Sequence, residues 1–160
     1  MTPEQTIIAS AIHSWKQQVE RADKVFSGLT DHQLQTEVAP GRNRLVYLWG
    51  HLSAVHDAML PLLGLGDRLH PELAAAFLTT PDKAADGLPP AAELQRHWGD
   101  VNGRLLAAFG NFTVSDWVGK HTAVSDEDFA ANPLRNRLSV LLSRTSHLSY
   151  HIGQTALAPK

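Results

Sequence analysis

Apolar residues recur along this chain in alternating steps of three and four, the spacing that places side chains on one face of an α-helix. Thr2 and Pro3 precede the first such run as a capping residue and a first-turn proline, and Ser27-Gly28 follows it as a helix end. This pattern predicts one long amphipathic helix at the start of the chain. The apolar positions of the run are Ile8, Ile12, Trp15, Val19, Ala22 and Phe26.

Three more runs with this spacing predict three more helices. They span about residues 43–63, 90–110 and 133–157, and Pro61 should kink or end the first of them. No alternation of the kind typical of β-strands extends over a useful length. Four amphipathic helices joined by long connections predict an all-α fold, namely a four-helix bundle.

Two long connections separate these helices. Residues 64–90 are rich in Gly and Pro and contain one predicted short helix, at about residues 72–78. Residues 111–132 are irregular, and we expect Trp117 and Phe129 to anchor them onto the core. Neither part of the chain on either side of the first connection could bury a core alone, so no domain boundary is placed there.

Composition narrows the function. The chain has 160 residues, of which 43% are hydrophobic, as expected for one globular domain, residues 1–160. Its formal net charge of −2 argues against nucleic-acid binding, which normally requires a basic patch. Neither a basic amphipathic helix nor an apolar run of about 20 residues occurs, so no membrane association is expected. The first residues lack the features of a secretion signal, which favours a cytoplasmic location.

Cysteine is absent from the chain. The protein therefore contains no disulfide, no thiolate ligand and no cysteine nucleophile. Any metal ion must be held by histidine or carboxylate, and any thiol that takes part in chemistry must belong to a substrate.

Three histidines are predicted to converge on one metal ion. His147 and His151 lie four residues apart in the last predicted helix, so their side chains share one face. His51 lies on the apolar face of the second predicted helix, between Leu48 and Val55. Burying three imidazoles without partners would cost desolvation energy, whereas one metal ion would satisfy all three. Such a site leaves coordination positions open, as catalytic metal sites do.

The remaining histidines are not predicted to be ligands. His56 lies about 140° around the helix from His51, too far to share its metal. His97 flanks the apolar seam of the third helix and could at most support a metal ligand without binding the metal itself. The others, on the polar side of the first helix or in connections, are His13, His32, His70 and His121.

The segments around the three histidines resemble the DinB family of helical metalloenzymes, and the likeness covers nearly the whole chain. The family pattern has one His within a sequence such as LxxHL in the second helix, and HxxxH followed by Gly-Gln in the fourth. The corresponding segments here are residues 48–52 (LWGHL) and 147–154 (HLSYHIGQ). Residues 40–43 (PGRN) also resemble the family's entry into the second helix.

The resemblance implies an up-up-down-down four-helix bundle, often a homodimer, in which His51, His147 and His151 hold one divalent metal ion per chain. Members of known activity use low-molecular-weight thiols, for example as bacillithiol or mycothiol transferases. The implied function is a metal-dependent enzyme, either a thiol-dependent S-transferase or a hydrolase, that acts on a small molecule. Zinc is the favoured ion, with nickel, iron or manganese as alternatives.

Two roles in such a site stay open at the level of the sequence. Arg144 lies three residues before His147 and could bind a substrate carboxylate, or it could form an ion pair at the edge of the bundle. No acidic residue shares the helix faces of the three histidines, so a general base would have to come from elsewhere. Asp57 and Glu72 are the candidates. Tyr150 and Gln154 could orient the ligands from behind.

A different class of function fits the same pattern. Without a general base, the protein could be a non-catalytic metal-binding helical module that acts through a dimer or partner interface. The two hypotheses differ in a measurable way, because only the enzyme would turn over a thiol and an electrophile and lose that activity on chelation.

Overall fold

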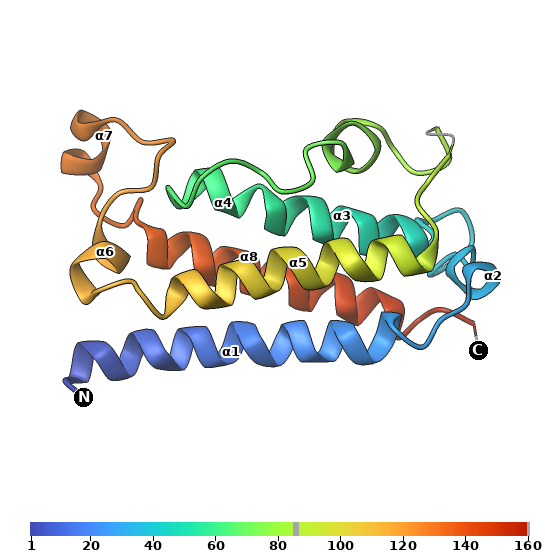
Figure 1. Ribbon diagram of the computed structural model, residues 1–160, viewed down its shortest axis with the longest axis horizontal. Helices are drawn as coiled ribbons and strands as arrows, with labels where there is room; N and C mark the ends of the chain where they lie inside the picture. The colour runs from blue at the N-terminus through green and yellow to red at the C-terminus, as the bar shows by residue number, and fades with distance from the viewer. Residues whose placement is uncertain (85–86, 160) are drawn as a thin grey trace.

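The protein is all-helical in its computed structural model, which describes residues 1–84 and 87–159 (Figure 1). Residues 85–86, within the predicted 64–90 connection, and residue 160 of the predicted domain lie outside the described residues. The long helices are α1 (Pro3–Phe26), α3 (Leu45–Asp57), α5 (Ala91–Phe109) and α8 (Arg137–Thr155). The short ones are α2 (Asp31–Leu34), α4 (Met59–Leu62), the π-helical turn η1 (Ala75–Thr79), α6 (Val114–Val118) and α7 (Asp126–Ala131). The predicted all-α class is confirmed.

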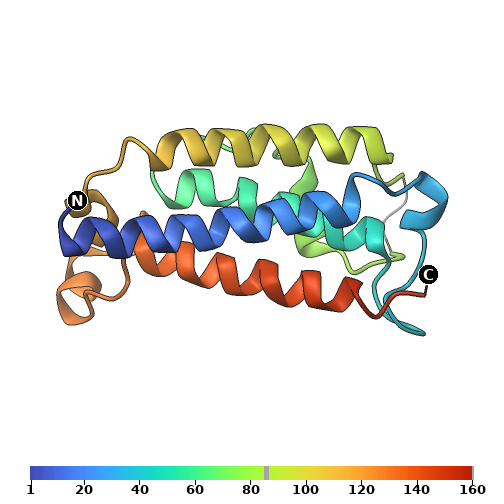
Figure 2. The ribbon, with the colours of Figure 1, turned by 90° about the horizontal axis from the view of Figure 1, so that it is seen from below.

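The four long helices lie side by side and run up, down, down and up in chain order (Figures 1 and 2). The predicted up-up-down-down order is therefore wrong, and the connections explain why. Residues 27–44 and 110–136 each turn back at one end of the bundle, which makes the helices that they join antiparallel. Residues 63–84 and 87–90, called the crossover from here on, return along the length of α3, so that α5 starts at the same end as α3.

Two predicted helix boundaries are confirmed and have simple local causes. α1 begins in a capping box, in which the Thr2 hydroxyl accepts from the Gln5 backbone N–H and the Gln5 side chain accepts from the Thr2 backbone N–H. Pro61 ends the second helix as expected. α3 stops at Asp57, four residues before the proline, because a proline ring clashes with the carbonyl at that position.

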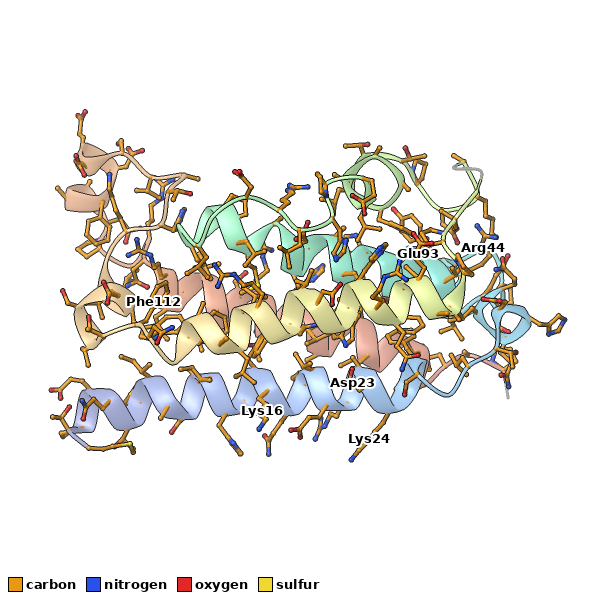
Figure 3. All side chains as sticks on the ribbon, viewed as in Figure 1. Lys16, Asp23, Lys24, Arg44, Glu93 and Phe112 are labelled. Atoms are coloured by element: carbon orange, nitrogen blue, oxygen red, sulfur yellow. The ribbon has the colours of Figure 1, made fainter. Side chains whose placement is uncertain are left out.

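The second helix starts slightly later than predicted, at Leu45 rather than Asn43. Arg44 is extended, and its backbone N–H donates to Asp82 Oδ2 at 2.6 Å. Its guanidinium also pairs with the same carboxylate, at 2.7 Å from Oδ1. Asp82 therefore ties the crossover to the first residue of the helix that carries His51, at the end of the bundle where Figure 3 labels Arg44.

The last helix is shorter than predicted at both ends, since it spans Arg137–Thr155 rather than residues 133–157. Asn136 is the reason at the start, because its Oδ1 accepts from the Ser139 backbone N–H at 2.9 Å and caps the helix there. The short helix expected at residues 72–78 is present as η1, shifted by three residues at its start.

The predicted anchors of the connection between α5 and α8 have different outcomes. Trp117 is buried at 1% exposure and its ring packs edge-on against Phe109, as expected. Phe129 is half-buried on α7 and belongs to neither hydrophobic core cluster, so its prediction as an anchor is wrong. None of the residues of α7 is buried.

The core consists of two hydrophobic clusters that follow one another along the bundle. One contains Phe26 and Trp49, whose rings stack at 5.3 Å, and the other contains Trp15 and Phe109. His56 lies fully buried, with its ring 5.8 Å from that of Trp15. None of the described helices has both the length and the apolar content that a membrane span requires.

Candidate metal centre

The structure brings His51, His147 and His151 together on the facing sides of α3 and α8. His147 Nε2 lies 3.2 Å from His51 Nε2 and 3.1 Å from His151 Nε2. The three rings are half-buried and tilted against one another, with centroids 4.5–5.1 Å apart. All three therefore point the same ring nitrogen at one small volume.

His51 is held in this orientation by the crossover. Its Nδ1–H donates to the backbone carbonyl of Phe77 at 2.8 Å, and the ring of Tyr47 stacks parallel to it. A carbonyl can only accept, so the proton of neutral His51 is on Nδ1 and its Nε2 carries a lone pair.

Gly50 makes this contact with Phe77 feasible. A Cβ built on Gly50 would lie 2.2 Å from the Phe77 ring, closer than any real contact. Phe77 is fully buried, so its ring has nowhere to withdraw without moving η1. The glycine before His51 thus lets η1 approach α3 closely enough for the Phe77 carbonyl to reach the imidazole.

His151 is held from its own helix. Its Nδ1–H donates to Gln154 Oε1 at 2.7 Å, and Gln154 Nε2 donates in turn to the Tyr150 hydroxyl at 3.1 Å. Gln154 and Tyr150 therefore do what their positions predict, which is to fix a ring from behind. His151 Nε2, like that of His51, is left with a lone pair that faces His147.

His147 lies between the other two and is the most perturbed of the three. Burial lowers its pKa to about 4, and the neighbouring His151, His51 and Arg144 act in the same direction. Burial also lowers the pKa of His151, against the effect of its hydrogen bond to Gln154. His147 and His151 are consequently neutral near pH 7, the form in which imidazole binds metals. His147 Nδ1 is buried without a hydrogen-bond partner among the described residues.

The donor set fits a divalent metal ion. His51 and His151 both present lone pairs to His147 Nε2, which can donate at most one proton, so direct hydrogen bonding cannot satisfy the group. Metal–nitrogen bonds of about 2.0–2.1 Å at tetrahedral angles separate two ligand nitrogens by about 3.3 Å. The separations of 3.2 and 3.1 Å between His147 Nε2 and the other two Nε2 atoms are within about 0.2 Å of that value. A cation at this point would satisfy all three lone pairs together.

The other predicted site residues lie in different surroundings. Arg144 is half-buried on α8, and its Nε is buried without a hydrogen-bond partner among the described residues. Its charge lowers the pKa of both His147 and His56, which places it near the three imidazoles.

Neither candidate base is directed at the three histidines. The Asp57 carboxylate is fully buried and accepts the backbone N–H groups of Leu69 and His70, at 2.8 and 3.1 Å. Glu72 Oε1 lies 3.4 Å from His70 Nδ1. Asp57 is thus a structural cap for the crossover, and Glu72 belongs to another group of side chains.

Two cavities lie along α8. One, of about 460 Å³, is lined by Tyr150 and Gln154 together with residues 38–43. The other, of about 360 Å³, is lined by Arg144 and by residues of the connection before α8. Each is large enough for a small molecule, and neither lining includes one of the three histidines.

Sequence reasoning did not find a second group of potential ligands, in which His70, Glu72 and His97 lie together. His70 and Glu72 are separated by one residue, a common ligand spacing, but nothing local indicates that they meet α5. Burial lowers the pKa of His97, with a further contribution from His70, while Glu93 and Glu72 act against it.

Comparison with known proteins agrees with this architecture. A family model described as the DinB superfamily matches residues 14–155, a range that contains all three histidines. Among solved structures, the chain is similar to a conserved protein from Enterococcus faecalis, with a TM-score of 0.63 and 18% sequence identity over 98% of this chain and 94% of that chain. At this identity the likeness shows the fold alone. No curated protein matches the chain.

Proposed function

The chain belongs to the DinB superfamily, and on that basis we propose that it is a metal-dependent enzyme whose site is formed by His51, His147 and His151. We propose that this site binds one divalent ion, with zinc as the working ion. The reaction that we favour is the transfer of a low-molecular-weight thiol to a small electrophile, with hydrolysis as the alternative.

One observation carries this proposal, namely the protonation pattern of the three rings. Phe77 and Gln154 fix protons on the outer nitrogens of His51 and His151. Three Nε2 atoms then converge with too few protons to bind one another. Imidazole ligands whose other nitrogens donate to the protein are the usual arrangement in metal sites.

The chain's own residues would divide the work as follows. When bound, a divalent ion supplies Lewis acidity, which lowers the pKa of a thiol or water that contacts it. Arg144, one turn before His147, would bind an anionic group of the substrate through its guanidinium, whose Nε has no hydrogen-bond partner among the described residues. The thiol sulfur would then attack the electrophilic carbon, a C–S bond would form, the leaving group would depart with its bonding electrons, and the thiol proton would pass to solvent.

Two features support thiol transfer over hydrolysis. The chain contains no cysteine, so a sulfur nucleophile must arrive with a substrate. Asp57 is occupied by backbone amides, so it is not free to act as a base on water. A thiol needs less help, because its ordinary pKa of about 8.5 is already near neutrality.

The test combines metal analysis with turnover. Protein without a tag would be reconstituted with zinc, and its metal content would be measured by plasma mass spectrometry beside His51→Ala. A panel of low-molecular-weight thiols and electrophiles would then be screened before and after chelation. We expect thiol-dependent turnover that chelation and His51→Ala both abolish. Metal binding without turnover of any thiol or ester substrate would contradict the enzyme and favour the non-catalytic module.

Arg144→Gln tests the substrate role separately. The variant should retain its metal and raise KM for anionic substrates more than for neutral ones, because only the former need the guanidinium. An equal effect on both substrate classes would refute the assignment.

A further inference from the structure

A second cluster of potential metal ligands lies outside the three-histidine site. It consists of His70 and Glu72 from the crossover and His97 from α5, and it is called the crossover cluster here. It shares no residue and no helix with the first site. We propose that the crossover cluster is a second divalent metal site, selective for zinc-like transition ions, which fastens the crossover to α5. The inference goes beyond the proposed enzymatic function and does not rest on it.

The geometry brings one atom of each residue close together. Glu72 Oε1 lies 3.4 Å from His70 Nδ1 and 3.9 Å from His97 Nε2. The rings of His70 and His97 are tilted by 36° against each other, with centroids 4.0 Å apart. Ligands at about 2.0–2.2 Å from one ion are separated by roughly 3.3–3.6 Å at tetrahedral angles. Only the longer contact must shorten, and Glu72, whose side chain is 60% exposed, is free to rotate.

Two more carboxylates surround these ligands. Asp100 Oδ2 lies 3.4 Å from His70 Nε2, the ring nitrogen that does not face Glu72. A carboxylate at that nitrogen favours a proton there and a lone pair on Nδ1, as in carboxylate–histidine–metal arrangements. Glu93 Oε1 lies 3.7 Å from His97 Nε2 and could supply a further oxygen ligand. It lies on α5, where Figure 3 labels it.

Burial shows that this is a built site rather than a chance meeting of surface groups. His97 is only 4% exposed, and its Nδ1 is buried without a hydrogen-bond partner among the described residues. Within the part of the chain that the structure describes, its Nε2 has two longer carboxylate contacts, with Glu72 and Glu93. A buried imidazole without protein hydrogen bonds carries a desolvation cost, and a metal ion between Nε2 and the carboxylates would offset the part of it that belongs to Nε2.

The backbone on the crossover side is held in advance. The buried Asp57 carboxylate accepts the N–H groups of Leu69 and His70, which fixes the first ligand relative to the end of α3. The Arg104 guanidinium donates to the Leu65 carbonyl at 3.3 Å and ties the same segment to α5. His70 is therefore presented to His97 by contacts that need no metal.

The ligand set determines the class of ion. Two imidazoles and a carboxylate suit zinc, cobalt, nickel and iron(II), whereas magnesium and calcium prefer oxygen ligands. Glu72 lies five residues before Phe77, whose carbonyl orients His51. An ion in the crossover cluster would thus stabilise the segment on which the first site depends.

Metal stoichiometry is the direct test, with zinc and cobalt(II) as the probes. Wild type should bind two ions per chain, His147→Ala one, and the double variant His147→Ala/Glu72→Gln none. Glu20→Gln is the matched control, because Glu20 lies on α1 with an exposure of 56% against 60% for Glu72. It should change nothing. Equal stoichiometry in the Glu72→Gln and Glu20→Gln proteins would overturn the proposal.

The single variants separate this proposal from the proposed function. One ion in wild type, lost in His147→Ala and kept in Glu72→Gln, would refute the crossover cluster alone. One ion lost only in Glu72→Gln would refute the three-histidine site instead. If His147→Ala does not fold, Glu72→Gln in the wild-type background should reduce two ions to one. Asp100→Asn should lower the affinity for the second ion by about 10–100-fold, the effect typical of a residue that orients a ligand.

Limited proteolysis gives a readout that does not depend on activity. In the His147→Ala background, trypsin cleavage after Arg68 should slow about tenfold at zinc concentrations ten times the Kd, because ligand binding reduces the open population by that factor. Glu72→Gln should abolish this protection and Glu20→Gln should keep it. Protection that persists in Glu72→Gln would show that zinc acts elsewhere.

Discussion

The three-histidine site takes its ligands from two long helices, whereas the crossover cluster joins a helix to a connecting segment. In the first site, Phe77 and Gln154 fix the outer nitrogens of two rings. In the second, His97 has no hydrogen bond among the described residues. The separations reflect this difference, with 3.1–3.2 Å between ligand nitrogens in the first and 3.4–3.9 Å to Glu72 in the second.

The comparison shows what each cluster is suited to do. Ligands locked before the ion arrives keep their geometry when a coordination position is open, which a reaction requires. Ligands that must rotate to close around the ion gain order from it, which suits a site that stabilises a loop. We therefore expect tighter metal binding at the three-histidine site and a larger change in local order at the crossover cluster.

Removing the central ligand should have the largest effect. His147→Ala deletes the nitrogen that faces both other rings, so affinity at the three-histidine site should fall by more than about 100-fold, beyond the loss expected for residues behind a ligand. Isothermal titration with zinc measures this affinity. His13→Ala, an exposed histidine on α1, is the control and should bind as wild type does. Unchanged affinity in His147→Ala would exclude it as a ligand.

Gly50→Ala should test the preset geometry of the first site. The new methyl group would collide with the Phe77 ring and displace the carbonyl that orients His51. We expect zinc affinity to fall by about 10–100-fold and the free energy of unfolding by about 1–3 kcal/mol.

Gly103→Ala is the matched control for this change, because a Cβ there meets nothing within 4 Å. It should leave zinc affinity unchanged and raise stability slightly, by up to about 1 kcal/mol, since alanine favours a helix interior. If both glycine variants bound zinc equally well, the Phe77 tether would be irrelevant to the site.

His56 sharpens the comparison, because it is a buried histidine outside both clusters, and its Nε2 has no hydrogen-bond partner among the described residues. Its Nδ1–H donates to Asn102 Oδ1 at 2.7 Å, and burial lowers its pKa from 6.5 to about 4. The unfolded chain therefore binds this proton more readily than the folded protein does. Stability should fall as the pH drops from about 6.5 towards 4, and by roughly 2–3 kcal/mol at pH 4.5.

Urea unfolding in the presence of a chelator, at about pH 7 and about pH 4.5, measures this loss. His56→Gln should reduce the difference in unfolding free energy between the two pH values by roughly 2–3 kcal/mol. His13→Gln should keep the wild-type difference. If His56→Gln loses as much unfolding free energy at acid pH as wild type does, the loss comes from other titrating groups.

Gln154→Leu should have the smallest effect of the four. It removes the acceptor that fixes His151 but leaves all three ligands in place. Zinc affinity should fall by about tenfold, the lower part of the range for such partners. Tyr150→Phe acts one hydrogen bond further from His151, so it should lower zinc affinity by less than Gln154→Leu does. A larger loss of affinity in Tyr150→Phe would contradict this order of contacts.

Much of the fold and of the first site could be predicted from the sequence. The three-and-four spacing located the long helices, Pro61 ended the second one, and the spacing of His147 and His151 placed them on one face. Phe129 was misplaced because an aromatic residue in an irregular segment carries no periodic signal. The bundle order was wrong because the lengths of two similar connections do not say which one turns back and which one crosses.

The sequence by itself determined the helices, the register of the ligands along them and the exclusion of thiol chemistry from the protein's own side chains. These properties are local, since each depends on residues within a few turns or on composition. Tertiary structure alone decided the direction of each helix, the contact of Phe77 with His51, and the meeting of His70 with His97. Phe77 and His51 are 26 positions apart in the sequence. Such contacts depend on how the crossover packs along the bundle rather than on any local preference.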